Sequence, residues 1–200
     1  AGVLAGENPF DALGDQITGF WTKNMQAALV SQLTGIFLDN TANDSADMDF
    51  DIYSDIATPL AANKISADAI IEAKYTMGDA NKELSIMVAH SSVAKTLQLL
   101  EPNDFIPKSA TQPFSTYMGT LILEDDTMTV GTGHTNTPFY HTYLLGVGSI
   151  GFGSSVSGIR PEEVERTAGG GNGLGIETLY TRRNFCIHPA GFDFLGASVT

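Results

Sequence analysis

The sequence predicts an α+β fold, in which helices occupy the first half of the chain and strands the second. The first observation is a long segment near the N-terminus whose apolar residues recur every three or four positions, as on one face of a helix. The second is a rear half in which β-branched and aromatic runs alternate with glycines, which is typical of short strands. No repeat period accompanies these patterns, and 200 residues with 42% hydrophobic content suffice for one domain, or for one large and one small domain.

The longest periodic segment runs from Asn8 to Phe37 and predicts an amphipathic helix with Asp11 as its N-cap. Counted from Asp11, this helix would be about 40 Å long at about 1.5 Å per residue. Gly14 and Gly19 each cost about 1 kcal/mol relative to alanine, so the helix requires packing, and we expect a strand or neighbouring subunit to approach closely there. The apolar positions are Leu13, Ile17, Phe20 or Trp21, Met25, Ala28 or Leu29, Leu33, and Ile36 or Phe37.

An acidic loop follows this helix and leads into Met48–Ile52, whose strict alternation predicts a strand exposed on one face. Ser66 is the expected N-cap of a second helix, and Gly78 is the expected residue just after its end. These signals place a short strand and a short helix between the long helix and the centre of the chain.

Leu84–Ala89 is a compact apolar run that predicts a buried strand. The residues after it predict a helix, because Val93, Leu97 and Leu100 fall on one helical face and Pro102 stops the pattern. A strand followed directly by a helix is therefore expected at the centre of the chain.

The rear of the chain is expected to be mainly strands. The expected strands are residues 117–123, 137–147 and 149–152, with a turn at 124–126 and another strand beginning within 127–130. Residues 162–167 and 176–188 are expected to form the two arms of a hairpin, joined by the glycine-rich segment GGGNGLG.

Charge excludes one class of function. The formal net charge of −13 argues against a surface that grips nucleic acid or anionic membrane. Residues 1–126 hold 18 acidic and 6 basic residues, whereas residues 127–200 hold 5 and 4. No apolar run is long enough to cross a bilayer. The single cysteine, Cys186, excludes an internal disulfide and lies in an apolar strand context, so a buried inert thiol is expected.

No motif predicts an enzyme, a cofactor site or a metal site. Gly146–Gly151 matches G-x-G-x-x-G, but no helical segment follows it, so a glycine-bent strand is the preferred interpretation. Asp47, Asp49 and Asp51 mimic an EF-hand start, yet Ile52 replaces its glycine and Thr58 its final glutamate. The histidines are scattered, without the i, i+4 spacing of a zinc helix; they are His90, His134, His141 and His188.

Several segments, taken in order, resemble the major capsid proteins of tailed bacteriophages and prophages. The central segments HSSVAKTLQLLEPNDFIP and YMGTLILEDDTM resemble that family's strand, helix and acidic turn. The rear segments YLLGVGSIGFGSS, EEVER and ETLYTRRNFCIHPAGFDFLGA are similar to its last strands, and NMQAALVSQLTGIF resembles its long spine helix. The likeness covers most of residues 16–197.

The resemblance implies the Hong Kong 97 capsid fold, which has a peripheral P-domain with the spine helix and a mixed α/β axial A-domain. The approximate boundaries are 1–37 for the spine helix, 38–175 for most of the A-domain, and 176–200 for strands that return to the P-domain. In that family an N-terminal arm and an E-loop precede the spine helix, so we expect this chain to be a fragment that lacks both.

The implied function is that of a structural coat protein. Its copies would form hexamers and pentamers of an icosahedral shell that encloses DNA without sequence-specific binding. The implied location is the virion, with assembly in the bacterial host cytoplasm and without enzymatic activity, cofactor or membrane. The alternatives are an encapsulin-like compartment shell and an unrecognised enzyme.

In such a shell the functional residues lie between subunits. The candidates for subunit contact are Phe20, Trp21, Arg182 and Arg183. A local ion pair is the other interpretation of the two arginines. We expect the spine helix to pack chiefly against residues 176–194, with Phe20 or Trp21 left uncovered.

Overall fold

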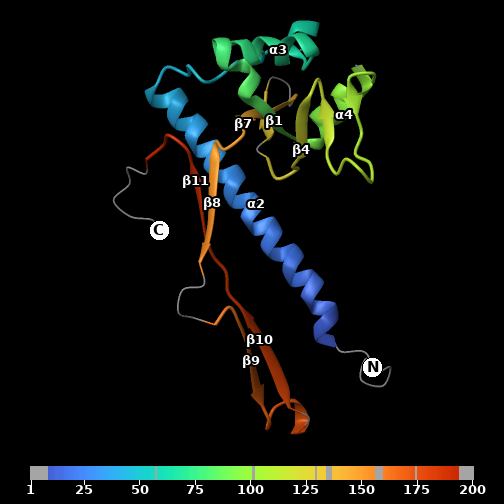
Figure 1. Ribbon diagram of the computed structural model, residues 1–200, viewed down its shortest axis with the longest axis vertical. Coiled ribbons are helices and arrows are strands. Elements are labelled where there is room, and N and C mark those ends of the chain that lie inside the picture. The colour runs from blue at the N-terminus through green and yellow to red at the C-terminus, as the bar shows by residue number, and fades with distance from the viewer. Residues whose placement is uncertain are drawn as a thin grey trace. The chain divides into compact units, whose positions relative to one another are not determined.

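The computed structural model describes residues 9–56, 58–100, 102–128, 130–133, 137–155, 160–173 and 175–193, without the side chains of 9–12 and 15. It contains both helices and sheets, so the predicted α+β class is confirmed (Figure 1). The chain divides into two compact units, one formed by residues 1–25 with 150–200 and the other by residues 26–149. Each unit is described by itself.

The predicted long helix is present and is longer than expected, because α2 runs from Pro9 to Asn43. Asp11 is therefore inside the helix and is not its N-cap, and the first helical residue is a proline, which suits that position because its missing N–H would have no partner there. Within the second unit, Val30 and Leu33 of α2 are buried. The helix contacts β7 (Thr142–Gly146) there, through Thr34 and Phe37, which lie against Tyr143.

The end of α2 is fixed by Asn40, which is buried. Its side-chain amide donates to Asp47 Oδ1 at 2.7 Å, and its Oδ1 accepts from the backbone N–H of Met48 at 3.3 Å. The strand predicted for Met48–Ile52 is absent from these described residues, so that prediction is wrong. The reason is local. The side chain of Asn40 accepts from the backbone N–H of Met48, and the side chain of Asp51 accepts from the backbone N–H of Tyr53, so these N–H groups are not available for pairing with another strand.

Replacing Asn40 by alanine is expected to destabilise the protein by about 1–3 kcal/mol, because it removes a buried side chain that makes two hydrogen bonds, to Asp47 and to the backbone N–H of Met48. Urea unfolding followed by circular dichroism measures the loss. Asn43→Ala is the matched control, since Asn43 is exposed and its amide bonds Asp39. Equal effects of the two substitutions would contradict this role of Asn40.

A five-stranded sheet with the order β2-β3-β4-β1-β7 forms the centre of the second unit. The predicted strand β1 (Leu84–Ala89) is confirmed, and it pairs parallel with β4 (Thr120–Glu124) and antiparallel with β7. The expected strand 117–123 is instead a hairpin of β3 (Ser115–Tyr117) and β4. Met118 and Gly119 both have positive φ, which closes a tight two-residue turn where a continuous strand was expected. The remaining edge strand is β2 (Phe105–Ile106).

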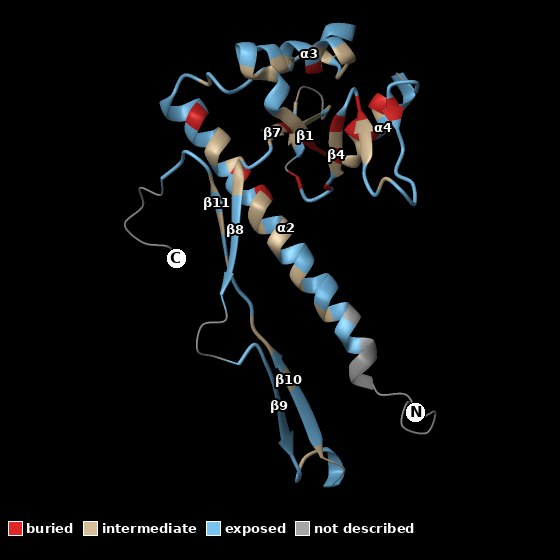
Figure 2. Ribbon diagram, in the orientation of Figure 1, coloured by how far each residue is buried: buried red, intermediate tan, exposed pale blue. Residues whose placement is uncertain are grey.

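Two helices pack on this sheet and close the hydrophobic core (Figure 2). Helix α3 (Ala67–Tyr75) begins after Ser66, whose hydroxyl accepts from Ala69 N–H as an N-cap, as predicted. Helix α4 (Ser91–Leu100) buries Val93, Ala94 and Leu97. Leu100 is exposed, so the predicted apolar face ends one turn earlier than expected. The core cluster consists of Ile70, Met87, Ala89, Val93, Ala94, Leu97, Phe105, Tyr117 and Ile122.

Shorter elements complete the second unit. The 3-10 helix η1 (Ala61–Asn63) precedes α3, and η2 (Gly78–Glu83) follows it. Gly78 has positive φ but lies two residues beyond the C-cap Thr76, one position later than expected. Strands β5 (Val130–Thr132) and β6 (Pro138–Tyr140) pair with each other.

The first unit contains two two-stranded sheets beside the N-terminal part of α2. Strand β8 (Ile150–Ser155) pairs antiparallel with β11 (Asn184–Pro189). Strand β9 (Glu162–Thr167) pairs antiparallel with β10 (Ile176–Thr181), and the turn between them contains η4 (Gly171–Gly173). The predicted hairpin is therefore confirmed, but its second arm ends at residue 181, because the chain beyond it pairs with β8 instead of β9.

The helical glycines Gly14 and Gly19 have open space around them. A Cβ added at either position would meet nothing within 4 Å among the described residues, so no strand of this chain approaches them. We expect Gly19→Ala to raise the free energy of unfolding by about 1 kcal/mol through helix propensity. The control is Gly119→Ala, which should destabilise the protein because Gly119 has a φ of +74°. Thermal unfolding of the two variants tests the predicted increase in Tm for Gly19→Ala and the predicted decrease for Gly119→Ala. A lower Tm for Gly19→Ala would contradict the open space around Gly19.

Candidate assembly surfaces

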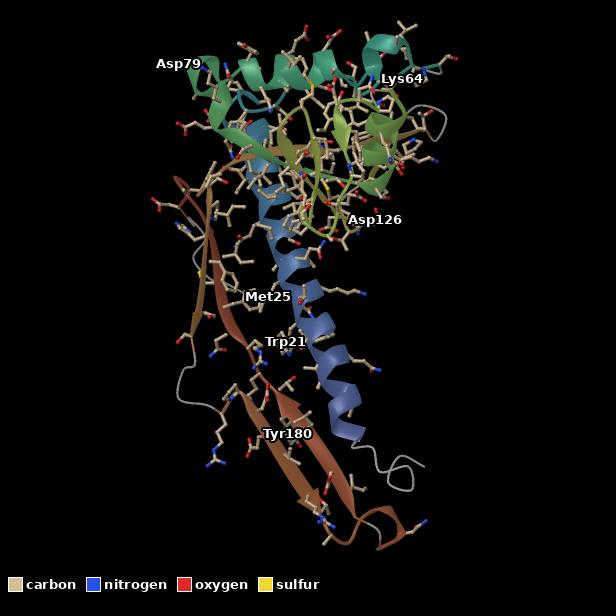
Figure 3. All side chains as sticks on the ribbon, turned by 45° about the vertical axis from the view of Figure 1, so that its right-hand side comes forward. Trp21, Met25, Lys64, Asp79, Asp126 and Tyr180 are labelled. Carbon is tan, nitrogen blue, oxygen red and sulfur yellow. The ribbon has the colours of Figure 1, made fainter. Side chains whose placement is uncertain are left out.

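The N-terminal part of α2 presents one free and one anchored aromatic residue. Phe20 is 60% exposed, whereas Trp21 is partly buried and donates from Nε1 to Thr181 Oγ1 at 3.2 Å (Figure 3). The two rings contact edge to face, with centroids 5.5 Å apart. The expected contact between the spine helix and residues 176–194 is therefore present at Trp21, and Phe20 is the residue left uncovered.

The β9–β10 hairpin carries apolar side chains that this chain does not cover. Every residue of β9 is exposed, and Val164, which pairs with Leu179, is 56% exposed. Ile176 and Tyr180 are exposed on β10. The register places Val164 and Leu179 on one face of the hairpin and Ile176 and Tyr180 on the other, so both faces carry exposed apolar side chains. A two-stranded hairpin is marginally stable by itself, and exposed apolar patches in soluble proteins mark interaction sites. The hairpin is therefore the strongest candidate contact surface of the first unit.

Arg182 and Arg183 lie just after β10 and form ion pairs with the hairpin's opposite strand. Arg182 Nη1 is 3.2 Å from Glu163 Oε2, and Arg183 Nη2 is 2.9 Å from Glu162 Oε1. The guanidinium of Arg182 also lies 5.6 Å from the centroid of the Tyr180 ring. The local ion pairs expected from the sequence are confirmed, and as partly exposed pairs each contributes at most about 1 kcal/mol.

Tyr180 is held in its neutral form on the same face of the hairpin. Its hydroxyl donates to Glu165 Oε2 at 3.1 Å. This hydrogen bond, together with the negative charge of Glu165, raises the pKa of Tyr180 above its usual value. The ring of Tyr180 offers an apolar surface beside the ion pair of Arg182 and Glu163.

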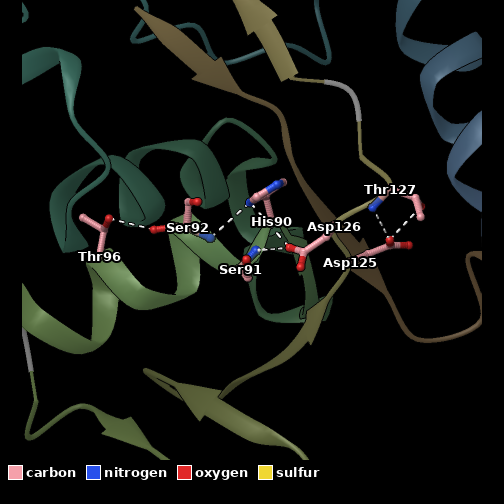
Figure 4. A network of polar contacts seen from close by, with 7 residues as sticks. All are labelled: His90, Ser91, Ser92, Thr96, Asp125, Asp126 and Thr127. Carbon is pink, nitrogen blue, oxygen red and sulfur yellow. Dashed lines mark hydrogen bonds and ion pairs between the residues drawn. The ribbon is translucent and has the colours of Figure 1, made fainter.

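A polar network joins β1, α4 and the end of β4 in the second unit (Figure 4). His90 Nδ1 accepts from the backbone N–H of Ser92 at 3.1 Å, and Asp126 Oδ1 accepts from the backbone N–H of Ser91 at 3.1 Å. These bonds satisfy two of the donors at the start of α4. The network arises because β1 and β4 are parallel, so their carboxyl ends deliver His90 and Asp126 to the same edge of the sheet.

The network contains Ser, His and Asp but lacks the geometry of a catalytic triad. His90 Nδ1 and Asp126 Oδ1 are 3.6 Å apart, which is beyond hydrogen-bond distance. Because Nδ1 accepts the Ser92 N–H, it has no proton to donate to Asp126 in this arrangement. Asp126 therefore does not orient the imidazole as a triad requires, and the arrangement caps a helix.

Asp125, next to Asp126, is buried and closes the turn after β4. Its Oδ1 accepts from the backbone N–H and the hydroxyl of Thr127, at 2.7 and 2.6 Å. Its own N–H donates to the carbonyl of Ala89 at 3.0 Å. The acidic turn predicted at residues 124–126 is thus confirmed as a structural turn that also fastens the end of β1.

Acid should weaken the start of α4. Hydrogen bonds from the side chain and the backbone of Ser91 lower the pKa of Asp126 below its usual value. A carboxyl whose folded-state pKa is depressed stabilises the fold above its unfolded pKa of about 4, and this stability is lost as pH falls through the folded value.

We expect Asp126→Ala to lower the Tm at neutral pH and to reduce the further loss of Tm on acidification below about pH 4. Thermal unfolding across this pH range measures both effects. Asp104→Ala, at an exposed turn, is the control. An unchanged acid dependence in Asp126→Ala would contradict the assignment.

The other motifs have structural roles. Gly146 ends β7, Gly148 has positive φ in the turn, and β8 begins at Ile150, so the interpretation of G-x-G-x-x-G as a bend between strands is confirmed. Among the described residues, no group of three or more His, Cys, Asp or Glu side chains lies close enough to hold a metal ion. His134 lies outside the described residues.

The expectation of a buried thiol is wrong, because Cys186 is exposed. Residues of β11 alternate between exposed and partly buried, and Cys186 falls on the exposed side. The sheet of β8 and β11 has only two strands, so the apolar neighbours of Cys186 in the sequence do not cover it.

Comparison with known proteins gives one informative match. Over 195 residues, which is 97% of this chain, the sequence is 28% identical to the major capsid protein of Bacillus phage SPP1. The chain is similar to a phage major capsid protein. The chain spans 56% of that protein's length, and no family model matches. This match offers no support for the encapsulin-like alternative.

In the part of the chain that the structure describes, no helix is both long and apolar enough to pass through a bilayer.

Proposed function

We propose that the protein is a structural major capsid protein of a tailed phage or prophage, and that its copies assemble into an icosahedral shell. The observation that carries the proposal is the similarity to the SPP1 major capsid protein along nearly the whole chain. Two features support the elements that the family resemblance implied. These are the long helix α2 and the strand β1, which is followed directly by helix α4.

The proposal extends to the Hong Kong 97 fold and its domains. The spine helix and the C-terminal strands would form the P-domain, and residues 38–175 most of the A-domain. The compact unit of residues 26–149, which contains the five-stranded sheet, supports an A-domain with its own core.

Assembly is proposed to use shallow contacts repeated between copies, in hexamers and pentamers. The hairpin side chains Val164, Ile176 and Tyr180, with Phe20 of α2, supply exposed apolar area for such contacts. Trp21, Arg182 and Arg183 hold this surface in shape and border it.

The net charge suits a container for DNA. This chain carries a formal charge of −13, and an acidic lining would repel the phosphate backbone, so packaged DNA would not adhere to the shell. The proposed location is the virion, after assembly in the cytoplasm of the bacterial host, and the proposed role requires no catalytic site or cofactor.

The test is to express the complete reading frame in bacteria, with any accessory genes beside it, and to examine the purified product by electron microscopy. Regular closed shells are the expected result. A monodisperse small species under all of these conditions, together with a measurable enzymatic activity, would overturn the proposal.

A further inference from the structure

The second unit contains an open cleft of about 750 Å³. The C-terminal half of α2, residues 49–65, the first turns of α4, and β6 with β7 form its walls. This volume lies in the range of ligand and peptide-anchor pockets. Its lining is rich in aromatic side chains, namely Phe37, Phe50, Tyr53, Phe139, Tyr140 and Tyr143.

Two glycines leave space for two of these rings. The rings of Tyr53 and Phe139 lie 4.6 Å apart. A Cβ at Gly131 would lie 1.9 Å from the Phe139 ring, and a Cβ at Gly133 would lie 2.4 Å from the Tyr53 hydroxyl. A side chain at residue 131 would overlap the Phe139 ring, and one at residue 133 would require the hydroxyl end of Tyr53 to move, so the two glycines give these rings room.

Two aspartates contribute to the lining of the cleft. Asp49 and Asp51 line it, alternating with Phe50 and Ile52. Between residues 39 and 63 the sequence has six aspartates and no glutamate, lysine or arginine. Among the described residues that line the cleft, Lys64 is the one lysine or arginine. The alternation that predicted a strand instead places carboxylates and apolar side chains side by side in the lining of the cleft.

We propose that this cleft is a docking site for a basic peptide segment of a partner protein, with lysine or arginine facing Asp49 and Asp51 and an apolar side chain entering beside Phe50 and Tyr53. Aromatic anchor pockets with charged rims are typical of peptide recognition. Charge complementarity selects the occupant, because a second copy of this chain carries −13 and nucleic acid is also anionic. The proposal does not rest on the shell role.

The test uses a fluorescein-labelled synthetic peptide in which lysines flank two phenylalanines, with fluorescence anisotropy as the readout. Binding should weaken as salt is raised. Asp49→Asn with Asp51→Asn should weaken binding about tenfold, since each of these charges acts at a partly exposed site. Asparagine at residue 51 can still accept the Tyr53 N–H, so the loop should keep its shape. Phe50→Ser should weaken binding by a similar factor.

Matched controls separate this site from general attraction to an acidic protein. Asp79→Asn with Asp104→Asn removes the same charge at exposed positions that do not line the cleft, and it should leave binding unchanged. A peptide with serine in place of phenylalanine should bind at least about tenfold more weakly. Equal weakening by both pairs of variants, or equal binding of the serine peptide, would overturn the proposal. So would self-association of the chain that Phe50→Ser abolishes, because a second copy would then be the occupant.

Discussion

Replacing Leu33 by aspartate is expected to unfold the second compact unit. Leu33 is 4% exposed on α2, in the stretch where the helix packs beside β7. Removing a buried leucine side chain costs about 2–5 kcal/mol, and placing a carboxylate there adds its own desolvation cost. Because single domains are stable by only about 5–15 kcal/mol, this change can remove most of the stability.

Leu38→Asp is the matched control, because Leu38 is on the same helix but 65% exposed. Its effect on the free energy of unfolding should lie within about 0.5 kcal/mol. Urea unfolding monitored by circular dichroism and by tyrosine fluorescence distinguishes the two variants. A Leu33→Asp protein with the stability of Leu38→Asp would show that the buried face of α2 is wrongly assigned.

Replacing Val164 by aspartate is expected to abolish shell assembly by the complete protein while leaving its fold intact. Val164 is exposed on the β9–β10 hairpin, so its loss removes little packing within the chain. In a shell the same substitution recurs in every copy, and it would place a carboxylate in an apolar contact, on the hairpin face that already carries Glu162. Phe20→Ser should act in the same direction through the neighbouring α2 surface.

The readouts are the fraction of protein that sediments as shells and the Tm of the unassembled protein. Leu99→Asp, an equally polar change at an exposed position in the second unit, is the control and should leave the shell fraction near that of the unmodified protein. Normal shell yield from Val164→Asp would remove the hairpin from the assembly surface. A lowered Tm would show instead that the hairpin matters for folding.

Local sequence signals predicted the regular elements well where periodicity and capping agree. The long helix, the strand 84–89, the Ser66 cap and the 162–181 hairpin follow from apolar spacing, a capping hydroxyl and a glycine-rich turn. The same signals failed at residues 48–52, where side chains from Asn40 and Asp51 bind the backbone. They also failed at Leu100 and Cys186, whose exposure depends on how far the packed surface extends.

The candidate surfaces were predicted only in part. Phe20 and the basic pair Arg182-Arg183 were identifiable because a large aromatic residue on a helix and an isolated basic pair are conspicuous in an acidic chain. The pairing of Arg183 with Glu162 needed the register of β9 and β10, and the aromatic cleft needed rings from β6 and residues 49–56 to meet. In the sequence, only Gly131 and Gly133 indicated the cleft. They do so because the rings of Phe139 and Tyr53 lie against them, which the sequence does not show.

The sequence by itself determined the α+β class, the long helix, the acidic character and the likeness to phage capsid proteins, because these depend on composition, periodicity and the order of segments. The tertiary structure decided which residues are buried, which strands pair, and where carboxylates and rings meet. The reason is physical. Strand register and side-chain contact join residues far apart in the chain, such as Trp21 with Thr181 and His90 with Asp126, and local patterns carry no information about such pairs.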